Sequence, residues 1–160
     1  MELQQSSQIP TRDARAIVTG LEAKIRELPD AMGPECFPLE HSFAHGLYVR
    51  QVFVPKGVLI ISKIHRFSHA AFLLQGEISI FGTEGITRRL KAPTSIITPA
   101  GTKRAVYHHE DTVFATVHAT VKTDLAEIEE EIIAKSFDEV DDFIDVEYIT
   151  GVIREMEGIT

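Results

Sequence analysis

The sequence predicts a mainly β protein whose short strands form a barrel or a sandwich, with a helix before them and an acidic, partly helical extension after them. The first observation is a series of about eight apolar or alternating segments between residues 47 and 121. The second is that turn residues, chiefly glycine and proline, separate these segments at short intervals, as in all-β domains. The third is a change to a helical period on either side of this region.

Residues 1–40 are expected to form a polar arm followed by one helix. The arm covers residues 1–10, and Thr11 can cap a helix that runs to about Leu28. The apolar residues of this helix recur at intervals of three and four and so share one side. They are Ala14, Ile17, Val18, Leu21, Ile25 and Leu28. Prolines and a glycine then break the chain, and the apolar side packs either on the same chain or on a partner.

The barrel region is placed at residues 41–122. Its expected strands are 47–54, 58–64, 70–75, 77–81, 86–90, 95–98, 104–107 and 113–121. A loop with glycine at both ends, Gly82 and Gly85, joins the fourth and fifth strands as a hairpin. His41 and His45 precede the first strand and are expected in a surface loop.

Residues 123–160 are expected to form an acidic C-terminal extension. Asp124 and Glu127 have the spacing of a capping box for a helix that ends near Lys135. The rest of the extension mixes acidic with apolar residues, whereas a solvated acidic tail lacks so many apolar side chains. We therefore expect it to pack on its own domain or on a neighbouring subunit.

The apolar residues outside the barrel also predict an assembly. A small barrel fills its interior with its own side chains, so apolar stripes outside it need another surface to cover them. The side chains expected at an interface with another subunit or protein are Ile17, Leu21, Ile25, Phe137, Phe143 and Ile144.

Composition argues against several classes of protein. The chain has 160 residues and a formal net charge of −8, whereas a general nucleic-acid binder presents a basic face. No segment has the roughly 18 consecutive apolar residues of a membrane helix, and the polar N-terminus lacks the pattern of a signal peptide. The single cysteine, Cys36, excludes an intramolecular disulfide. We therefore expect a cytoplasmic protein that does not associate with membranes.

Two histidines lie at a polar corner between two apolar strands. On one straight strand, residues four apart are roughly 13 Å apart, which is too far to share an ion. If the chain turns at residues 66–68, His65 ends one strand and His69 begins the next, so both rings can point into one cavity. Neutral imidazoles bind zinc, iron, nickel or copper. Two ligands are a weak signal, because a catalytic metal usually has three protein ligands.

Two spaced motifs resemble those of the cupin family. The first cupin motif is glycine, five residues, histidine, one residue, histidine, three or four residues, glutamate, six residues and glycine. Those places hold Gly57, Lys63, His65, His69 and Gly76. The second motif places glycine, proline, glycine, histidine and asparagine at fixed intervals. Those places hold Pro93, Pro99, Gly101, Arg104 and His108. The resemblance covers residues 47–121 and implies a double-stranded β-helix, also called a jelly-roll barrel.

Only half of the metal-ligand positions that the resemblance implies keep metal-binding side chains. The positions of the two histidines and the glutamate of the first motif are Lys63, His65 and His69, and that of the second-motif histidine is Arg104. If Lys63 and Arg104 point inward, their charges disfavour a divalent ion. They suit a carboxylate or phosphate instead, which Arg104 can bind bidentately.

A metal site would then need a third histidine from elsewhere in the barrel. His118, on the last strand among apolar and small residues, is the best candidate. His108 and His109 are weaker candidates, because adjacent residues on a strand face opposite sides. The candidate metal ligands are therefore His65, His69 and His118, with iron, zinc or manganese as the ion.

Three hypotheses about function remain open, because the fold alone does not choose among them. The strings SHAAFLLQGEISI and ITPAGTKRAVYHHEDTVFATVH are similar to small cupin-like proteins encoded by tailed bacteriophages and prophages. The leading hypothesis is a non-catalytic structural or interaction subunit, homo-oligomeric or bound to other assembly proteins, in the host cytoplasm or a virion. The alternative is a metal-dependent enzyme of the dioxygenase or isomerase type. The third is a sensor that binds a small anion at Lys63 and Arg104.

Overall fold

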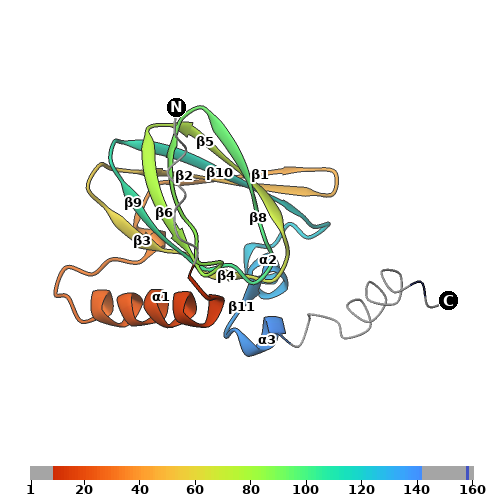
Figure 1. Ribbon diagram of the computed structural model, residues 1–160. Helices are drawn as coiled ribbons and strands as arrows, with labels where there is room; N and C mark the ends of the chain where they lie inside the picture. The colour runs from red at the N-terminus through yellow and green to blue at the C-terminus, as the bar shows by residue number, and fades with distance from the viewer. Residues whose placement is uncertain (1–8, 142–157, 159–160) are drawn as a thin grey trace.

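The computed structural model describes residues 9–141 and residue 158, and it confirms a mainly β fold with an N-terminal helix (Figure 1). A five-stranded sheet has the order β1 (Leu39–Ala44), β2 (Leu47–Val54), β10 (Thr112–Ala119), β5 (His69–Gln75) and β8 (Thr94–Thr98). A four-stranded sheet has the order β3 (Leu59–Ile61), β9 (Arg104–His108), β6 (Glu77–Gly82) and β7 (Thr87–Lys91). A two-stranded sheet joins β4 (Ile64–His65) to β11 (Ile133–Ala134).

The strands of the two larger sheets pair in a nested order. β2 pairs with β10, β3 with β9, β5 with β8, and β6 with β7, and every pair is antiparallel. A nested series of this kind is one long hairpin that has rolled up, so that successive strands alternate between the two sheets. This is the jelly-roll barrel that the resemblance to cupins implies, and the predicted fold class is confirmed.

The two glycines of the first motif occupy backbone positions that other residues rarely adopt. Gly57 has φ 84° and Gly76 has φ 87°, in the left-handed region that favours glycine. A Cβ atom at Gly76 would also lie 2.5 Å from the carbonyl oxygen of Asp111. Both glycines therefore end strand-to-strand turns that a larger residue would strain.

The helices lie at one end of the barrel (Figure 1). They are α1 (Thr11–Arg26), the short 3-10 helix η1 (Pro34–Cys36), α2 (Leu125–Ile132) and α3 (Asp138–Asp141). Asp124 caps α2, as predicted, because its carboxylate accepts hydrogen bonds from the backbone N–H groups of Ala126 and Glu127 at 3.0 Å each. Thr11 does not cap α1. Pro10 precedes the helix, and its carbonyl accepts the first helical hydrogen bonds.

Two predicted elements differ from the structure. The expected strand at 58–64 is divided, because β3 pairs with β9 whereas β4 leaves that sheet to pair with β11. The expected loop before residue 47 contains strand β1, which pairs with β2 along its whole length. His41 therefore lies in a strand rather than a loop, although its side chain is exposed as predicted.

The described terminal segments contact their own barrel. Ala14 and Val18 of α1 are fully buried, and Glu22 forms an ion pair with Lys103. Arg15 binds both carboxylate oxygens of Asp141, at 2.7 and 2.8 Å. None of the helices in the described segments combines the length and the apolar character that spanning a bilayer requires.

The residues expected at an interface divide into three groups. Ile17 is half exposed, and Leu21 and Ile25 are partly buried. Phe137 packs against Ile64, Ala134 and Val140 of its own chain, and the guanidinium of Arg15 lies 4.4 Å from its ring centroid. Residues Phe143 and Ile144 lie outside the described residues. Contact with another subunit stays a prediction for this set.

Candidate metal centre and ligand cavity

A cavity of about 340 Å³ lies inside the barrel and changes from polar to apolar along the strands. The polar part is lined by Tyr48, Arg50, His65, His69, Thr98 and His118. The apolar part is lined by Val52, Val54, Ile80, Ile96, Val106 and Phe114. Ile128 and Ile132 of α2 border the polar part, where they pack with Tyr48.

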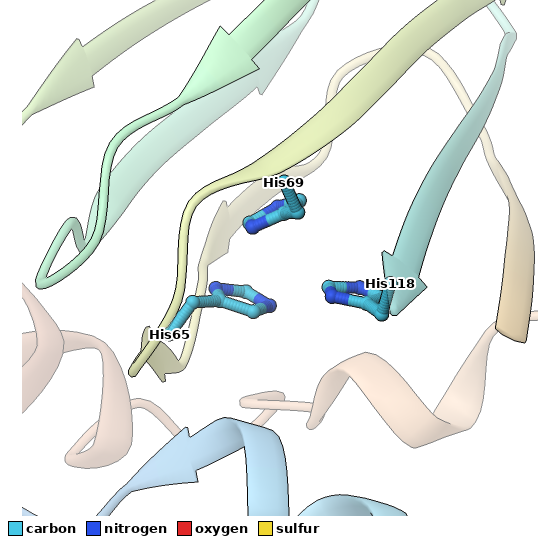
Figure 2. A group of neighbouring side chains, drawn as sticks. All are labelled: His65, His69 and His118. Carbon is cyan, nitrogen blue, oxygen red and sulfur yellow. The ribbon is translucent and has the colours of Figure 1, made fainter. Parts of the chain in front are cut away.

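Three histidines converge in the polar part (Figure 2). One nitrogen atom from each of His65, His69 and His118 lies within 4.8 Å of the other two. The ring centroids are 4.4 Å apart for His65 and His69, and 4.5 Å apart for His69 and His118. The structure therefore brings together the three residues that the sequence proposed as metal ligands.

The backbone explains why these rings meet. His65 ends β4 and His69 begins β5, so the corner at residues 66–68 turns the chain between them. The corner is held from outside, because the Arg66 N–H donates to the carbonyl of Ile132 and the Gly101 N–H donates to the carbonyl of His65, each at 2.8 Å. In the β5–β10 pairing, Ala70 is opposite Val117, which places His69 beside His118.

Burial keeps the three imidazoles neutral near pH 7. Burial, followed by the proximity of His69 and His118, lowers the pKa of His65 to about 3. Burial lowers the pKa of His118 to about 4, and it also lowers the pKa of His69. A neutral imidazole has an unprotonated nitrogen, which is the form that binds a metal ion.

Hydrogen bonds outside the cluster orient two of the rings. His69 Nδ1 lies 3.3 Å from the carbonyl oxygen of Phe67. Because a carbonyl only accepts, Nδ1 carries the proton and Nε2 has the free lone pair. His118 Nε2 hydrogen-bonds the Thr116 hydroxyl at 3.0 Å. Contacts of this kind hold metal-binding histidines in position.

The donor set fits a transition-metal ion. Two nitrogens bound to one ion at about 2.0–2.1 Å are at most roughly 4.2 Å apart. The spacing of at most 4.8 Å among these nitrogens is close to that limit, so small rotations of the rings suffice. Three imidazoles suit zinc or iron, and three protein ligands leave a coordination position for a small molecule.

The two candidate anion-binding residues each have a carboxylate partner in the same chain. Lys63 is exposed and forms an ion pair with Glu129 of α2. Arg104 is buried, with Nη1 donating to the Thr98 hydroxyl at 2.7 Å and Nη2 to a Glu84 carboxylate oxygen at 3.3 Å. These carboxylates offset the positive charges that would otherwise repel a metal ion. Binding of an external anion by this pair stays a prediction.

Sequence reasoning did not identify Tyr48 and Arg50 as residues of the site. Both lie on β2 and line the cavity. The Tyr48 hydroxyl lies 2.8 Å from His41 Nδ1, and the Tyr48 ring stacks against that of His118. The alternation of β2 could have identified them, because Tyr48 and Arg50 share a face with Val52 and Val54.

His108 and His109 stay outside the three-histidine cluster. His108 lines the cavity, is buried and lies 2.6 Å from the Thr112 hydroxyl oxygen through Nδ1. Burial lowers the pKa of His108 to about 4. His109 Nε2 hydrogen-bonds the Ser79 hydroxyl at 2.7 Å, so the two neighbours contact different parts of the molecule, as their positions on one strand predict.

No protein-family model and no curated protein matches this chain. Among solved structures, the chain is similar to the cupin domain of Cnp3 from Schizosaccharomyces pombe, with 20% identity, 65% of this chain and 72% of that chain covered, and a TM-score of 0.46. KdgF from Halomonas sp. has 18% identity, 54% and 81% coverage, and a TM-score of 0.46. A Cupin 2 conserved barrel domain protein from Salinispora arenicola has 14% identity, 59% and 81% coverage, and a TM-score of 0.45.

Proposed function

We propose that this protein is a metal-dependent enzyme that acts on a small organic molecule inside the barrel, with His65, His69 and His118 as metal ligands. The observation that carries the proposal is the convergence of three neutral imidazoles in the polar part of a cavity. Closed structural sites usually have four protein ligands, whereas three leave a position for substrate or water.

Iron, zinc and manganese are the candidate ions, and a dioxygenase or isomerase type of reaction follows from the resemblance to cupins. A divalent ion held by His65, His69 and His118 would supply Lewis-acid chemistry at this place. The residues of the chain provide the rest of the site. Ile128 and Ile132 of α2 cover its polar part with apolar surface, which limits the access of water.

Metal uptake by histidine variants tests this proposal. Purified protein is dialysed against zinc, manganese or anaerobic ferrous iron, and bound metal is measured by elemental analysis. We expect one ion per chain in the wild type and strongly reduced uptake in His65→Ala, His69→Ala and His118→Ala. His45→Ala is the matched control, because His45 is an exposed turn residue that belongs neither to the cluster nor to the lining of the cavity. Absence of uptake by the wild type, or equal uptake by all variants, contradicts the proposal.

The second candidate is a structural or interaction subunit, which the outer surface of the five-stranded sheet favours. An outer apolar face is formed by Val49, Phe53, Phe72, Leu74, Ile97 and Val117. Leu74 is 50% exposed and Ile97 is 68% exposed, and exposed apolar patches usually mark contacts with other proteins. A place in a phage particle, which follows from the resemblance alone, is one form of this role. Either function is compatible with the cytoplasm as location, where the free thiol of Cys36 stays reduced.

A further inference from the structure

Arg50 lies in the cavity without a direct partner for its guanidinium. Among the residues that the structure describes, it forms no hydrogen bond or ion pair, and burial lowers its pKa, which the charges of Tyr48 and Glu129 only partly offset. The two other cations at the cavity differ in this respect, because Lys63 is bound to Glu129 and Arg104 to Glu84. A largely buried guanidinium without a hydrogen-bonded partner is unfavourable unless a ligand supplies the missing acceptors.

The position of Arg50 relative to the histidines is fixed by strand pairing. β2 places Tyr48, Arg50 and Val52 on the cavity face in that order. The pairing with β10 sets His118 opposite Tyr48, and Thr116 opposite Arg50. Arg50 therefore lies two residues further along β2 than Tyr48, the residue opposite His118, in the direction of the apolar part of the cavity. It is close enough to lower the pKa of His65 and of His118 through its charge.

The walls around Arg50 indicate the rest of the ligand. Val52 and Phe114 come next along β2 and β10, and Ile96 lines the same region from β8. Directly across the strand pairing from Arg50 is Thr116, which also lines the cavity. A cavity of about 340 Å³ is near the lower end of the size of ligand pockets. Such a space accepts one anionic group and a small apolar body.

We propose that Arg50 binds the carboxylate of a small organic acid whose apolar part rests on Val52, Ile96 and Phe114. The planar fork of a guanidinium matches the two oxygens of a carboxylate, and a single guanidinium without a direct partner suits a monoanion. The inference rests on the proposed function, because the same cavity receives the substrate there. The inference adds two points to the proposed function. The substrate is a monocarboxylate with an aliphatic or aryl body, and Arg50 is the residue that selects it.

Calorimetry with simple acids tests the inference on the full chain, both loaded with zinc and stripped of metal. The probes are benzoate and hexanoate, each compared with its uncharged amide of similar shape, at concentrations up to about 10 mM. We expect the carboxylates to bind and the amides to bind at least about tenfold more weakly. We expect Arg50→Met to weaken carboxylate binding by about 10- to 100-fold, the usual effect of losing a charge-assisted hydrogen-bonded pair.

Two further variants control the experiment. Arg12→Met removes an exposed arginine of α1 and leaves binding unchanged. Arg50→Lys keeps the charge without the bidentate fork, so we expect about tenfold weaker binding. It serves as the test if Arg50→Met does not fold. Because burial of the Arg50 guanidinium is not offset by a hydrogen bond or ion pair within the described segments, we also expect Arg50→Met to melt at the wild-type temperature or above it.

The outcomes separate this inference from the proposed function, because zinc uptake is measured on the same samples. Loss of carboxylate binding in Arg50→Met with zinc uptake intact supports the inference. Equal carboxylate binding by wild type and Arg50→Met, or binding of neither acid by the wild type, overturns it and leaves the metal centre standing. If the wild type takes up no zinc, the proposed function fails. Carboxylate binding that is lost in Arg50→Met then still supports the anion site.

Discussion

Burial decides the protonation of the histidines inside this barrel, and the effect is clearest at His108, which is not a candidate ligand. The Thr112 hydroxyl donates to the carbonyl of Val54 at 3.2 Å, so its oxygen accepts from His108 Nδ1. A second proton would place a charge on the other nitrogen, inside the barrel. The pKa of His108 is accordingly lowered to about 4.

This lowered pKa predicts how stability depends on pH. Between pH 6.5 and 4 the unfolded chain binds a proton at this histidine that the folded chain does not bind, so stability falls as the pH decreases. From about pH 7.5 to about pH 5, the loss attributable to His108 is about 2 kcal/mol of unfolding free energy. We expect His108→Gln, which stays neutral, to lose that much less than the wild type in urea titrations at the two pH values. Equal losses in both proteins would show that His108 titrates normally.

At the residue scale, the sequence predicted the three histidines but not Arg50. His65, His69 and His118 could be found because motif spacing placed two of them at a corner and the last strand offered a third. Arg50 sits in the strand LYVRQVFV, where an arginine usually marks a solvent-facing position. Its inward position follows from the shared face with Val52 and Val54, and its lack of a partner depends on contacts that only the structure shows.

Among the elements, α2 connects local helix formation to the site. Ile128 and Ile132 are buried against Tyr48, and the carbonyl of Ile132 holds the corner between the two ligand histidines through Arg66. The helix is short, so its stability depends on its ends and its packing rather than on propensity. The cap at Asp124 therefore contributes to the geometry of the metal centre.

We expect Asp124→Ala to lower the free energy of unfolding by about 1 kcal/mol, because two backbone N–H groups lose their acceptor. Asp124→Ser is the matched control, since serine also caps helices and should retain most of that free energy. Chemical denaturation measures both variants. A second readout is zinc affinity, which we expect to fall in Asp124→Ala alone. A loss of the same size in both variants would show that the charge of Asp124, not its cap, is what matters.

Alternation and turn residues located most of the strands, and the two failures have different physical causes. The expected strand at 47–54 agrees with β2 at both ends. Strand β1 was missed because LEHSFA mixes polar and apolar residues at the edge of the sheet, where only one neighbour is present. The break between β3 and β4 depends on β11, a partner far along the chain. Long-range pairing of this kind leaves no periodic signal in the sequence.

On the scale of the whole molecule, contacts between the two ends of the described chain close one side of the barrel. Arg15 and Asp141 are 126 residues apart and form a two-point ion pair. Lys103 fixes α1 to the barrel through Glu22. The sequence left open whether the helix at residues 11–28 packs on its own chain or on a partner. In the described structure Ala14 and Val18 of this helix are buried within the chain, while Ile17 stays half exposed.

The outer apolar face is the surface that we propose for an assembly. Val49, Val117, Ala70 and Ile97 form one row across four adjacent strands, and Phe72 lies in the neighbouring row. A sheet face of this composition exposes apolar surface to water. Burying that surface against a second sheet would stabilise the associated form. In a two-fold dimer the same surface of both subunits forms the interface, so this face of one copy can pack against the same face of a second copy.

We therefore expect the protein to be a homo-oligomer that a single charge on this face weakens. Ile97→Lys places an ammonium group at the end of the row, on a residue that is 68% exposed, and association would have to remove that group from water. Thr87→Lys is the matched control, because Thr87 is exposed on β7 of the other sheet. Light scattering across a dilution series should show dissociation of Ile97→Lys at concentrations where the wild type and Thr87→Lys stay associated. A monomeric wild type would remove the support for an assembly role, and unchanged association of Ile97→Lys would move the interface to another face. Neither result would affect metal uptake at the three histidines, because His65, His69 and His118 line the cavity inside the barrel.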